Sequence, residues 1–166
     1  MTILITGGAG FIGSNFVLDW YKEKNERLIN LDLLTYASNI LNLEKVKNNP
    51  NHIFVEGDIN DKELITNLLE KYKPRAIINF AAESHVDRSI IKPNEFIRTN
   101  IIGTFNLLKC AVKYLENKNI RKKRDFIFLH ISTDEVFGEL NFEDEPFNEE
   151  SRYAPNSPYS ASKASS

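Results

Sequence analysis

Short apolar runs alternate along this chain with segments whose apolar residues recur every three or four positions. The runs predict buried strands at residues 2–6, 28–31, 52–56, 76–80 and 126–131. The periodic segments predict helices at residues 11–24, 38–47, 61–72 and 93–116, with another helix beginning at Ser157 or Pro158. Asp61 is a predicted N-cap, and Pro93 suits a first helical turn.

This regular alternation indicates parallel strands joined by crossover helices. We therefore expect an α/β fold with a doubly wound parallel sheet, the NAD(P)-binding Rossmann type. Residues 1–166 show no linker or compositional break, so we expect one dinucleotide-binding domain. The acidic stretch 139–150 is predicted to be a surface loop between the fifth strand and the last helix.

Composition removes several function classes. The 166 residues are 42% hydrophobic and 27% charged, with a formal net charge of −2, which offers no basic field for nucleic acid. The basic cluster 121–124 is interpreted as a solvated connector, and the single Cys110 as a small core residue. The three histidines show no metal-ligand spacing, and no apolar run approaches membrane-span length, so we expect a metal-free cytoplasmic protein.

A glycine-rich turn follows the first predicted strand and opens the first helix. Gly7, Gly10 and Gly13 give the G-x-x-G-x-x-G spacing, with Phe11 and Ile12 between the last two glycines. Glycines in this context let the backbone approach a pyrophosphate, which the N–H groups and positive end of the helix then bind. Because glycines also mark ordinary turns, the position between strand and helix is what favours dinucleotide binding.

Two further strand ends carry carboxylates. Asp32 ends the second strand, where an acidic residue accepts hydrogen bonds from an adenosine ribose and would repel a 2′-phosphate. NAD is therefore the expected cofactor, with a simple cap or turn as the alternative role of Asp32. Asp58 and Ile59 follow the third strand and are predicted to bracket the adenine, although Asp58 could instead only form a turn.

Small residues follow the fourth strand. Phe80 is followed by Ala81 and Ala82, which leave room for the middle of a cofactor, and then by polar residues that include Ser84. Ligands of open α/β sheets bind at the carboxyl ends of the strands, so we expect these residues at the cofactor.

Tyr159 and Lys163 are separated by one helical turn and share a face of the last predicted helix. A tyrosine has a pKa of about 10 and needs a neighbouring positive charge to act as a base near neutral pH. We expect Lys163, with an oxidised nicotinamide, to lower the pKa of Tyr159.

Asp134 and Glu135 follow Thr133 at the carboxyl end of the fifth strand. Consecutive strand residues point to opposite faces, so joint action requires the pair to leave the strand. An acid and a base side by side suit elimination of water; the alternative is a pair of exposed acids that opens the acidic loop.

These motifs in order resemble the N-terminal half of the dTDP-glucose 4,6-dehydratase family, within the extended short-chain dehydrogenases/reductases and the NAD-dependent epimerases/dehydratases. The matching blocks are residues 6–16, 34–37, 79–89, 99–104, 132–138 and 157–166. Related epimerases and decarboxylases share the glycine loop and the Tyr-x-x-x-Lys motif. They generally lack the Asp-Glu pair, so residues 132–138 are the specific block.

The resemblance implies an internal redox cycle with NAD as cofactor and dTDP-glucose as substrate. Tyr159 would take the C4 hydroxyl proton, Glu135 the C5 proton, and Asp134 would protonate the departing C6 hydroxyl. It further implies sugar contacts from Ser84 and Thr133, and cofactor contacts from Leu33, Leu34, Thr35, Thr99, Tyr159 and Lys163.

The resemblance also implies a homodimer formed through residues 93–116 and the Tyr159 helix. The sequence printed here ends three residues after Lys163, without the remaining strands and substrate lobe that the family carries. We therefore expect a sheet of about five strands and no turnover by these 166 residues alone. Another nucleotide-sugar epimerase or dehydratase, and a non-catalytic NAD-binding or dimerisation module, remain as alternatives.

Overall fold

The computed structural model describes residues 1–24, 26–117 and 125–166, so the predicted connector at 121–124 lies outside the described residues. The chain divides into two compact units. The sheet unit comprises Met1–Ala81 and Asn106–Ile131, and the helical unit comprises Ala82–Phe105 and Ser132–Ser166. Each unit is described below by itself.

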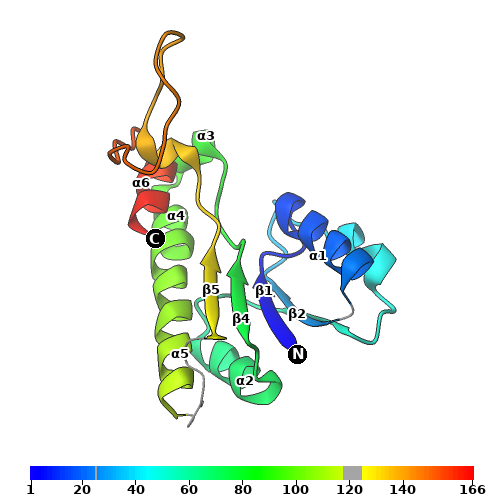
Figure 1. Cartoon of the computed structure of the whole chain (residues 1–166). Helices are drawn as coiled ribbons and strands as arrows, with labels where there is room; N and C mark the ends of the chain where they lie inside the picture. Colours follow the sequence, from blue (N-terminus) through cyan, green and yellow to red (C-terminus); the bar gives the residue numbers. More distant parts are fainter. Residues whose placement is uncertain (25, 118–124) are drawn as a thin grey trace. The chain divides into compact units, whose positions relative to one another are not determined.

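A five-stranded parallel sheet forms the centre of the sheet unit (Figure 1). Its strands are β1 (Thr2–Thr6), β2 (Arg27–Asp32), β3 (His52–Glu56), β4 (Ala76–Asn79) and β5 (Ile127–His130), in the spatial order β3-β2-β1-β4-β5. Every predicted strand is confirmed, with ends that differ by one residue at most. The order reverses direction between β1 and β4, the switch point at which such sheets bind ligands.

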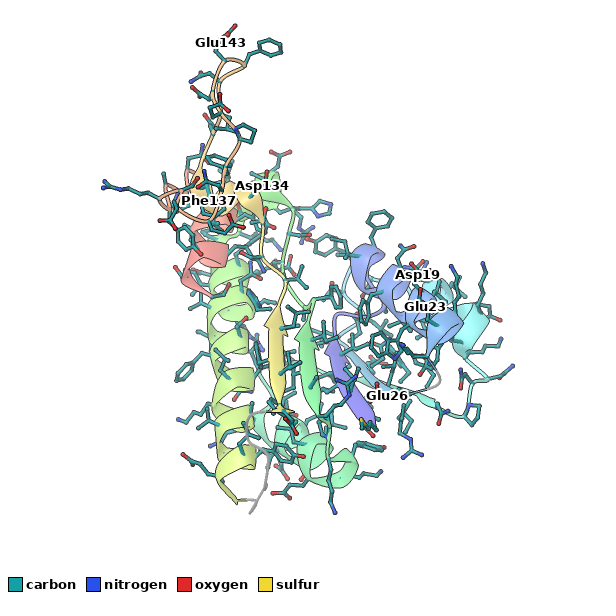
Figure 2. The ribbon with its side chains drawn as sticks, viewed as in Figure 1. Asp19, Glu23, Glu26, Asp134, Phe137 and Glu143 are labelled. Atoms are coloured by element: carbon teal, nitrogen blue, oxygen red, sulfur yellow. The ribbon has the colours of Figure 1, made fainter. Side chains whose placement is uncertain are left out.

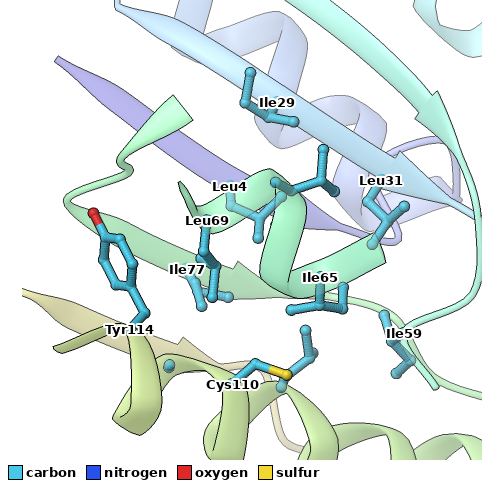
Figure 3. Packing of buried hydrophobic residues seen from close by; sticks show 12 residues of the cluster. Leu4, Ile29, Leu31, Ile59, Ile65, Leu69, Ile77, Cys110 and Tyr114 are labelled. Carbon is cyan, nitrogen blue, oxygen red and sulfur yellow. The ribbon is translucent and has the colours of Figure 1, made fainter. Parts of the chain in front are cut away.

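Two hydrophobic clusters cover the sheet, because successive residues of a strand point to opposite faces. On one face Leu4, Ile29 and Ile77 pack against helices α2 (Lys62–Tyr72) and α5 (Thr104–Asn117) (Figure 3). On the other face Ile3 and Ile5 pack in a cluster with residues of α1 (Phe11–Glu23), such as Val17, and of η1 (Ile40–Val46). Cys110 is buried in the first cluster, which confirms its predicted role as a core residue. Burial on both faces explains why the central strands β1, β2 and β4 read as largely apolar runs, whereas Ile127 and Leu129 of the edge strand β5 are exposed.

The helices of the sheet unit are α1 (Phe11–Glu23), α2 (Lys62–Tyr72) and most of α5 (Thr104–Asn117). Asp61 caps α2 as predicted, its side chain accepting the Leu64 N–H at 3.0 Å. The predicted helix 38–47 is instead a 3₁₀ helix, η1 (Ile40–Val46). Asn39 is its N-cap and accepts the Leu41 N–H at 2.9 Å, and Asn49, just past its end, accepts the Asn51 N–H at 2.9 Å. These local side-chain bonds mark both ends of a short helix.

The predicted helix 93–116 is not one regular α-helix. Pro93 opens α4 (Pro93–Phe96) as predicted, a π-helical segment η2 (Ile97–Gly103) follows, and α5 comes next. Single π turns inside helices occur frequently at functional sites. The helical unit also contains α3 (Val86–Ile91), which the sequence did not indicate.

The rest of the helical unit carries the acidic loop and the last helix. The 3₁₀ turn η4 (Asp134–Phe137) comes first, and the Phe137 ring packs on the rings of Phe147 and Tyr153 at 5.3 and 5.4 Å between centroids. After η4, residues 139–150 form the predicted loop, with Glu143 near its tip (Figure 2). Helix α6 (Pro158–Ser165) follows its N-cap Ser157, whose side chain forms a reciprocal capping box with Ser160.

Within the residues that the structure describes, no helix combines the length and apolar character that a membrane crossing would require.

Candidate dinucleotide and catalytic site

The glycine turn joins β1 to α1, and its glycines differ in what surrounds them. Gly7 has a φ of +72°, and a Cβ there would lie 2.5 Å from the Ala81 nitrogen. A Cβ on Gly13 would lie 2.3 Å from the Gly7 carbonyl oxygen. At Gly10 the nearest atom would be 3.4 Å away. Gly7 and Gly13 are therefore required by packing, whereas a Cβ on Gly10 would make only ordinary van der Waals contacts, with the Gly7 and Ala37 carbonyl oxygens.

The start of α1 fits an anionic ligand. Gly10 is the N-cap and offers no side-chain oxygen, and the first turn contains no acidic residue. The Phe11 and Ile12 side chains are exposed. No side-chain cap and no acidic residue of the first turn thus compensates the positive end of this helix. This geometry fits the pyrophosphate of a dinucleotide.

Asp32 is buried at the end of β2 and already accepts two backbone hydrogen bonds. Its Oδ2 accepts the Ala9 N–H at 2.9 Å, and its Oδ1 accepts the Leu34 N–H at 2.8 Å. Asp32 therefore does cap the turn, the role given above as its alternative to binding a ribose. Each carboxylate oxygen nevertheless keeps a second lone pair that could accept from a ribose hydroxyl. Leu33 is exposed, and Leu34 and Thr35 are half-buried in the following turn.

Asp58 and Ile59 have structural contacts of their own. Asp58 accepts the backbone and side-chain N–H groups of Asn60 at 2.8 and 2.9 Å, the turn that was its alternative role. The Ile59 side chain lies in the core with 5% exposure. The Phe80 N–H donates to the Thr6 carbonyl at 2.9 Å, and the Ala81 N–H to the Thr6 hydroxyl at 3.4 Å.

The remaining predicted cofactor residues belong to the helical unit. Ala82 and Thr99 are half-buried there, and Ser84 is exposed. Lys163 is buried with 5% exposure, one turn after Tyr159 on α6. Burial lowers the pKa of Lys163 to about 8.

The carboxylate pair leaves the strand, as the sequence argument required. Thr133 is the N-cap of η4: its hydroxyl accepts the Glu135 N–H at 3.3 Å and donates to Asp134 Oδ1 at 3.3 Å. Asp134 is exposed and Glu135 half-buried (Figure 2). Both carboxylates therefore start from one short turn whose geometry Thr133 fixes.

Tyr159 is buried beside this turn. Burial is the main cause that raises its pKa above 10.0; a hydrogen bond with Thr133 opposes the rise, and the Glu135 and Asp134 carboxylates add to it. The sequence argument expected a lowered pKa for Tyr159, and these contacts give the opposite direction. The phenol, the hydroxyl and both carboxylates are nevertheless close enough to interact within one unit.

Sequence reasoning missed Asn100, which is buried in η2 and hydrogen-bonds to Glu83 and Ser162. A usable signal was present, because Asn100 is a polar residue next to isoleucines in a helix that was expected to be amphipathic.

The parallel sheet, its switch point and the glycine turn define a Rossmann-type α/β protein of the kind built around dinucleotides. Residues 4–166 match the model of the GDP-mannose 4,6-dehydratase family, and the chain belongs to that family.

Relatives confirm the resemblance that the motifs indicated. The chain is 53% identical to a dTDP-glucose 4,6-dehydratase of Xanthomonas campestris pv. campestris (strain B100) over 99% of its own length, and 49% identical to that of Haemophilus influenzae over 100%. The dTDP-glucose 4,6-dehydratase DesIV of Streptomyces venezuelae, solved with NAD, superposes with a TM-score of 0.87 at 44% identity, covering 99% of this chain and 49% of that one. A UDP-glucose 4-epimerase of Thermotoga maritima gives a TM-score of 0.82 at 32% identity, with coverages of 99% and 48%.

The chain thus spans about half the length of the relatives that it matches: 46% of the Xanthomonas protein and 49% of the Haemophilus one.

Proposed function

We propose that this chain is the NAD-binding and catalytic half of a dTDP-glucose 4,6-dehydratase, in which residues 1–166 act as one functional domain. The observation that carries the proposal is the interaction of the Tyr159 phenol with Thr133 and with the carboxylates of Asp134 and Glu135. Oxidation of an alcohol needs one base, whereas elimination of water needs an acid and a base in addition. This cluster contains all three groups.

Each residue has a distinct task in the proposed reaction. Tyr159 takes the proton of the sugar's C4 hydroxyl, which requires its pKa to fall from the raised position that burial and the carboxylates produce. The positive charge of Lys163, together with that of a bound oxidised nicotinamide, would supply this effect. The C4 ketone then acidifies C5; Glu135 removes the C5 proton, and Asp134 protonates the C6 hydroxyl as it leaves as water. Thr133 and Ser84 hold the sugar hydroxyls.

The residues at the carboxyl ends of β1 and β2 fit NAD. Gly7, Gly10 and Gly13, with the N–H groups of Phe11 and Ile12, would hold the pyrophosphate, and Asp32 the adenosine ribose. Residues that would line the rest of the cofactor are Leu33, Leu34, Thr35, Asp58, Ile59, Phe80, Ala81, Ala82, Ser84, Thr99, Tyr159 and Lys163. When bound, NAD supplies the hydride acceptor for C4 and the hydride donor for C6.

The test uses a purified protein in which this chain is followed by a C-terminal half, either its own or that of the Xanthomonas relative. With dTDP-glucose in deuterated water, we expect a 4-keto-6-deoxy sugar that carries solvent deuterium at C5. Glu135→Gln should abolish both product and exchange, because no base then removes the C5 proton. Glu139→Gln, at an exposed position of the same acidic segment, is the matched control and should leave turnover unchanged.

The alternatives give different outcomes. A 4-epimerase would change the configuration at C4 without loss of water. A non-catalytic module would bind NAD, seen as saturable thermal stabilisation, without converting any sugar. Deuterium exchange that persists in Glu135→Gln would remove Glu135 from its assigned role.

A homodimer of a cytoplasmic protein is part of the proposal. Phe105, Leu108 and Val112 are exposed apolar residues at helical spacing in α5, and Ile97 and Ile102 are exposed in η2. Apolar residues repeated along a helix favour burial against another surface, and a second copy supplies one.

A further inference from the structure

Asn100 uses its side chain to join two segments of the helical unit. Asn100 is buried, with 1% exposure. The side-chain oxygen accepts the Glu83 N–H at 2.8 Å, and the nitrogen donates to the Glu83 carbonyl at 2.9 Å and to the Ser162 hydroxyl at 2.8 Å. The Asn100 side chain therefore hydrogen-bonds to both the N–H and the carbonyl of Glu83 and to helix α6.

Ser162 also hydrogen-bonds to Tyr159, one turn earlier in α6. Its hydroxyl is buried, accepts from Asn100, and donates to the Tyr159 carbonyl at 2.7 Å. A serine hydroxyl has one proton, so accepting from Asn100 fixes the direction in which that proton points. The chain of bonds thus runs from Asn100 through Ser162 to the backbone of Tyr159.

The Ser162 hydrogen bonds are more than the usual bond of a helical serine to a carbonyl of the preceding turn. Ser165, on the same helix, also donates to a carbonyl of the preceding turn, that of Ala161, at 2.8 Å, and it is exposed. Serines commonly bond in this way within helices. What distinguishes Ser162 is the donor on a different element, buried in the π-helical segment η2. Hydrogen bonds that are shielded from water contribute more than exposed ones.

We propose that Asn100 and Ser162 are positioning residues that fix α6 so that the Tyr159 ring stays beside Thr133. The Tyr159 ring also lies edge-on to Phe96, with 6.3 Å between ring centroids, so its place depends on how α6 packs against α4. The catalytic meaning of this positioning rests on the proposed function, but the positioning is measurable without any substrate.

The experiment follows ionisation of Tyr159 in the 166-residue chain by NMR of ¹³C-labelled tyrosine rings, with the signal assigned by its loss in Tyr159→Phe. Burial is the main cause of the raised pKa of Tyr159. Ser162→Ala frees the helix and exposes the ring to water, so we expect its acid dissociation constant to rise several-fold toward that of an ordinary tyrosine. Ser165→Ala removes an equivalent helical bond that does not involve Asn100, and should leave the Tyr159 ionisation unchanged.

Asn100→Asp gives an independent route to the same result. It keeps the shape and the acceptor for Glu83 but removes both donated hydrogen bonds. Its effect on Tyr159 should combine with that of Ser162→Ala in a strongly non-additive manner, because the two residues act through one bond. If Asn100→Asp does not fold, the Tyr159 ionisation in Ser162→Ala, compared with that in Ser165→Ala, tests the proposal alone.

The inference is overturned if Ser162→Ala leaves the Tyr159 ionisation where Ser165→Ala leaves it. This outcome would not affect dehydration by the complete protein, and a protein without dehydratase activity could still show the Ser162 effect. The two proposals therefore fail separately.

Discussion

Lys163 shows how a single buried residue connects the site to stability. Its pKa is lowered to about 8 in the folded chain, from 10.5, because the ammonium group is buried. The unfolded chain then binds more protons than the folded chain between these pKa values, so stability rises with pH across this window. The whole shift corresponds to roughly 3 kcal/mol, since each unit of pKa is worth about 1.4 kcal/mol.

We therefore predict that the stability of the chain relative to Lys163→Met rises by about 2 kcal/mol from about pH 7.5 to about pH 9.5. Urea unfolding at the two pH values measures it. Above pH 10 both proteins should lose absolute stability, because Tyr21, whose pKa is raised to about 12, and Tyr159 keep their protons in the folded state. The difference between the two proteins removes this shared contribution. A difference that does not change with pH would show that Lys163 titrates as it does in the unfolded chain.

At the scale of elements, the glycine turn contains a glycine that packing requires, Gly13, and one that is expected to serve mainly NAD binding, Gly10. Gly10 has ordinary angles, φ −73° and ψ 178°, and a Cβ there would make only ordinary van der Waals contacts, so Gly10→Ala should change stability by less than about 1 kcal/mol. Gly13→Ala places a methyl group 2.3 Å from the Gly7 carbonyl and should cost about 1–3 kcal/mol or more. Because the new methyl of Gly10→Ala enters the expected pyrophosphate space, that variant should lose thermal stabilisation by NAD. If Gly10→Ala binds NAD as tightly as the wild type, the pyrophosphate does not lie next to Gly10.

Sequence patterns identified the central strands because burial on both faces gives them largely apolar runs, as at Ile3 to Ile5. They also identified the Asp61 cap and the glycine turn, whose chemistry is local. The π segment around Asn100 and the raised pKa of Tyr159 were missed for a shared reason. Both depend on contacts between distant residues, such as Asn100 with Ser162 and Tyr159 with Thr133.

For the whole molecule, the central claim is that the hydride removed from C4 of the sugar returns to C6 after water has left. The relatives are about twice as long as this chain, so the measurement needs a protein in which a C-terminal half completes it. The chemistry assigned to Asp134, Glu135 and Tyr159 then gives a definite fate for each hydrogen.

The most direct measurement uses dTDP-glucose labelled with deuterium at C4, in ordinary water, with NMR analysis of the product. The proposal predicts a 4-keto-6-deoxy sugar with the label at C6 and a solvent proton at C5. Asp134→Asn and Glu135→Gln should each suppress this product, because elimination then lacks its acid or its base. Label that returns to C4 of an epimerised sugar, or product without label at C6, would contradict the proposal.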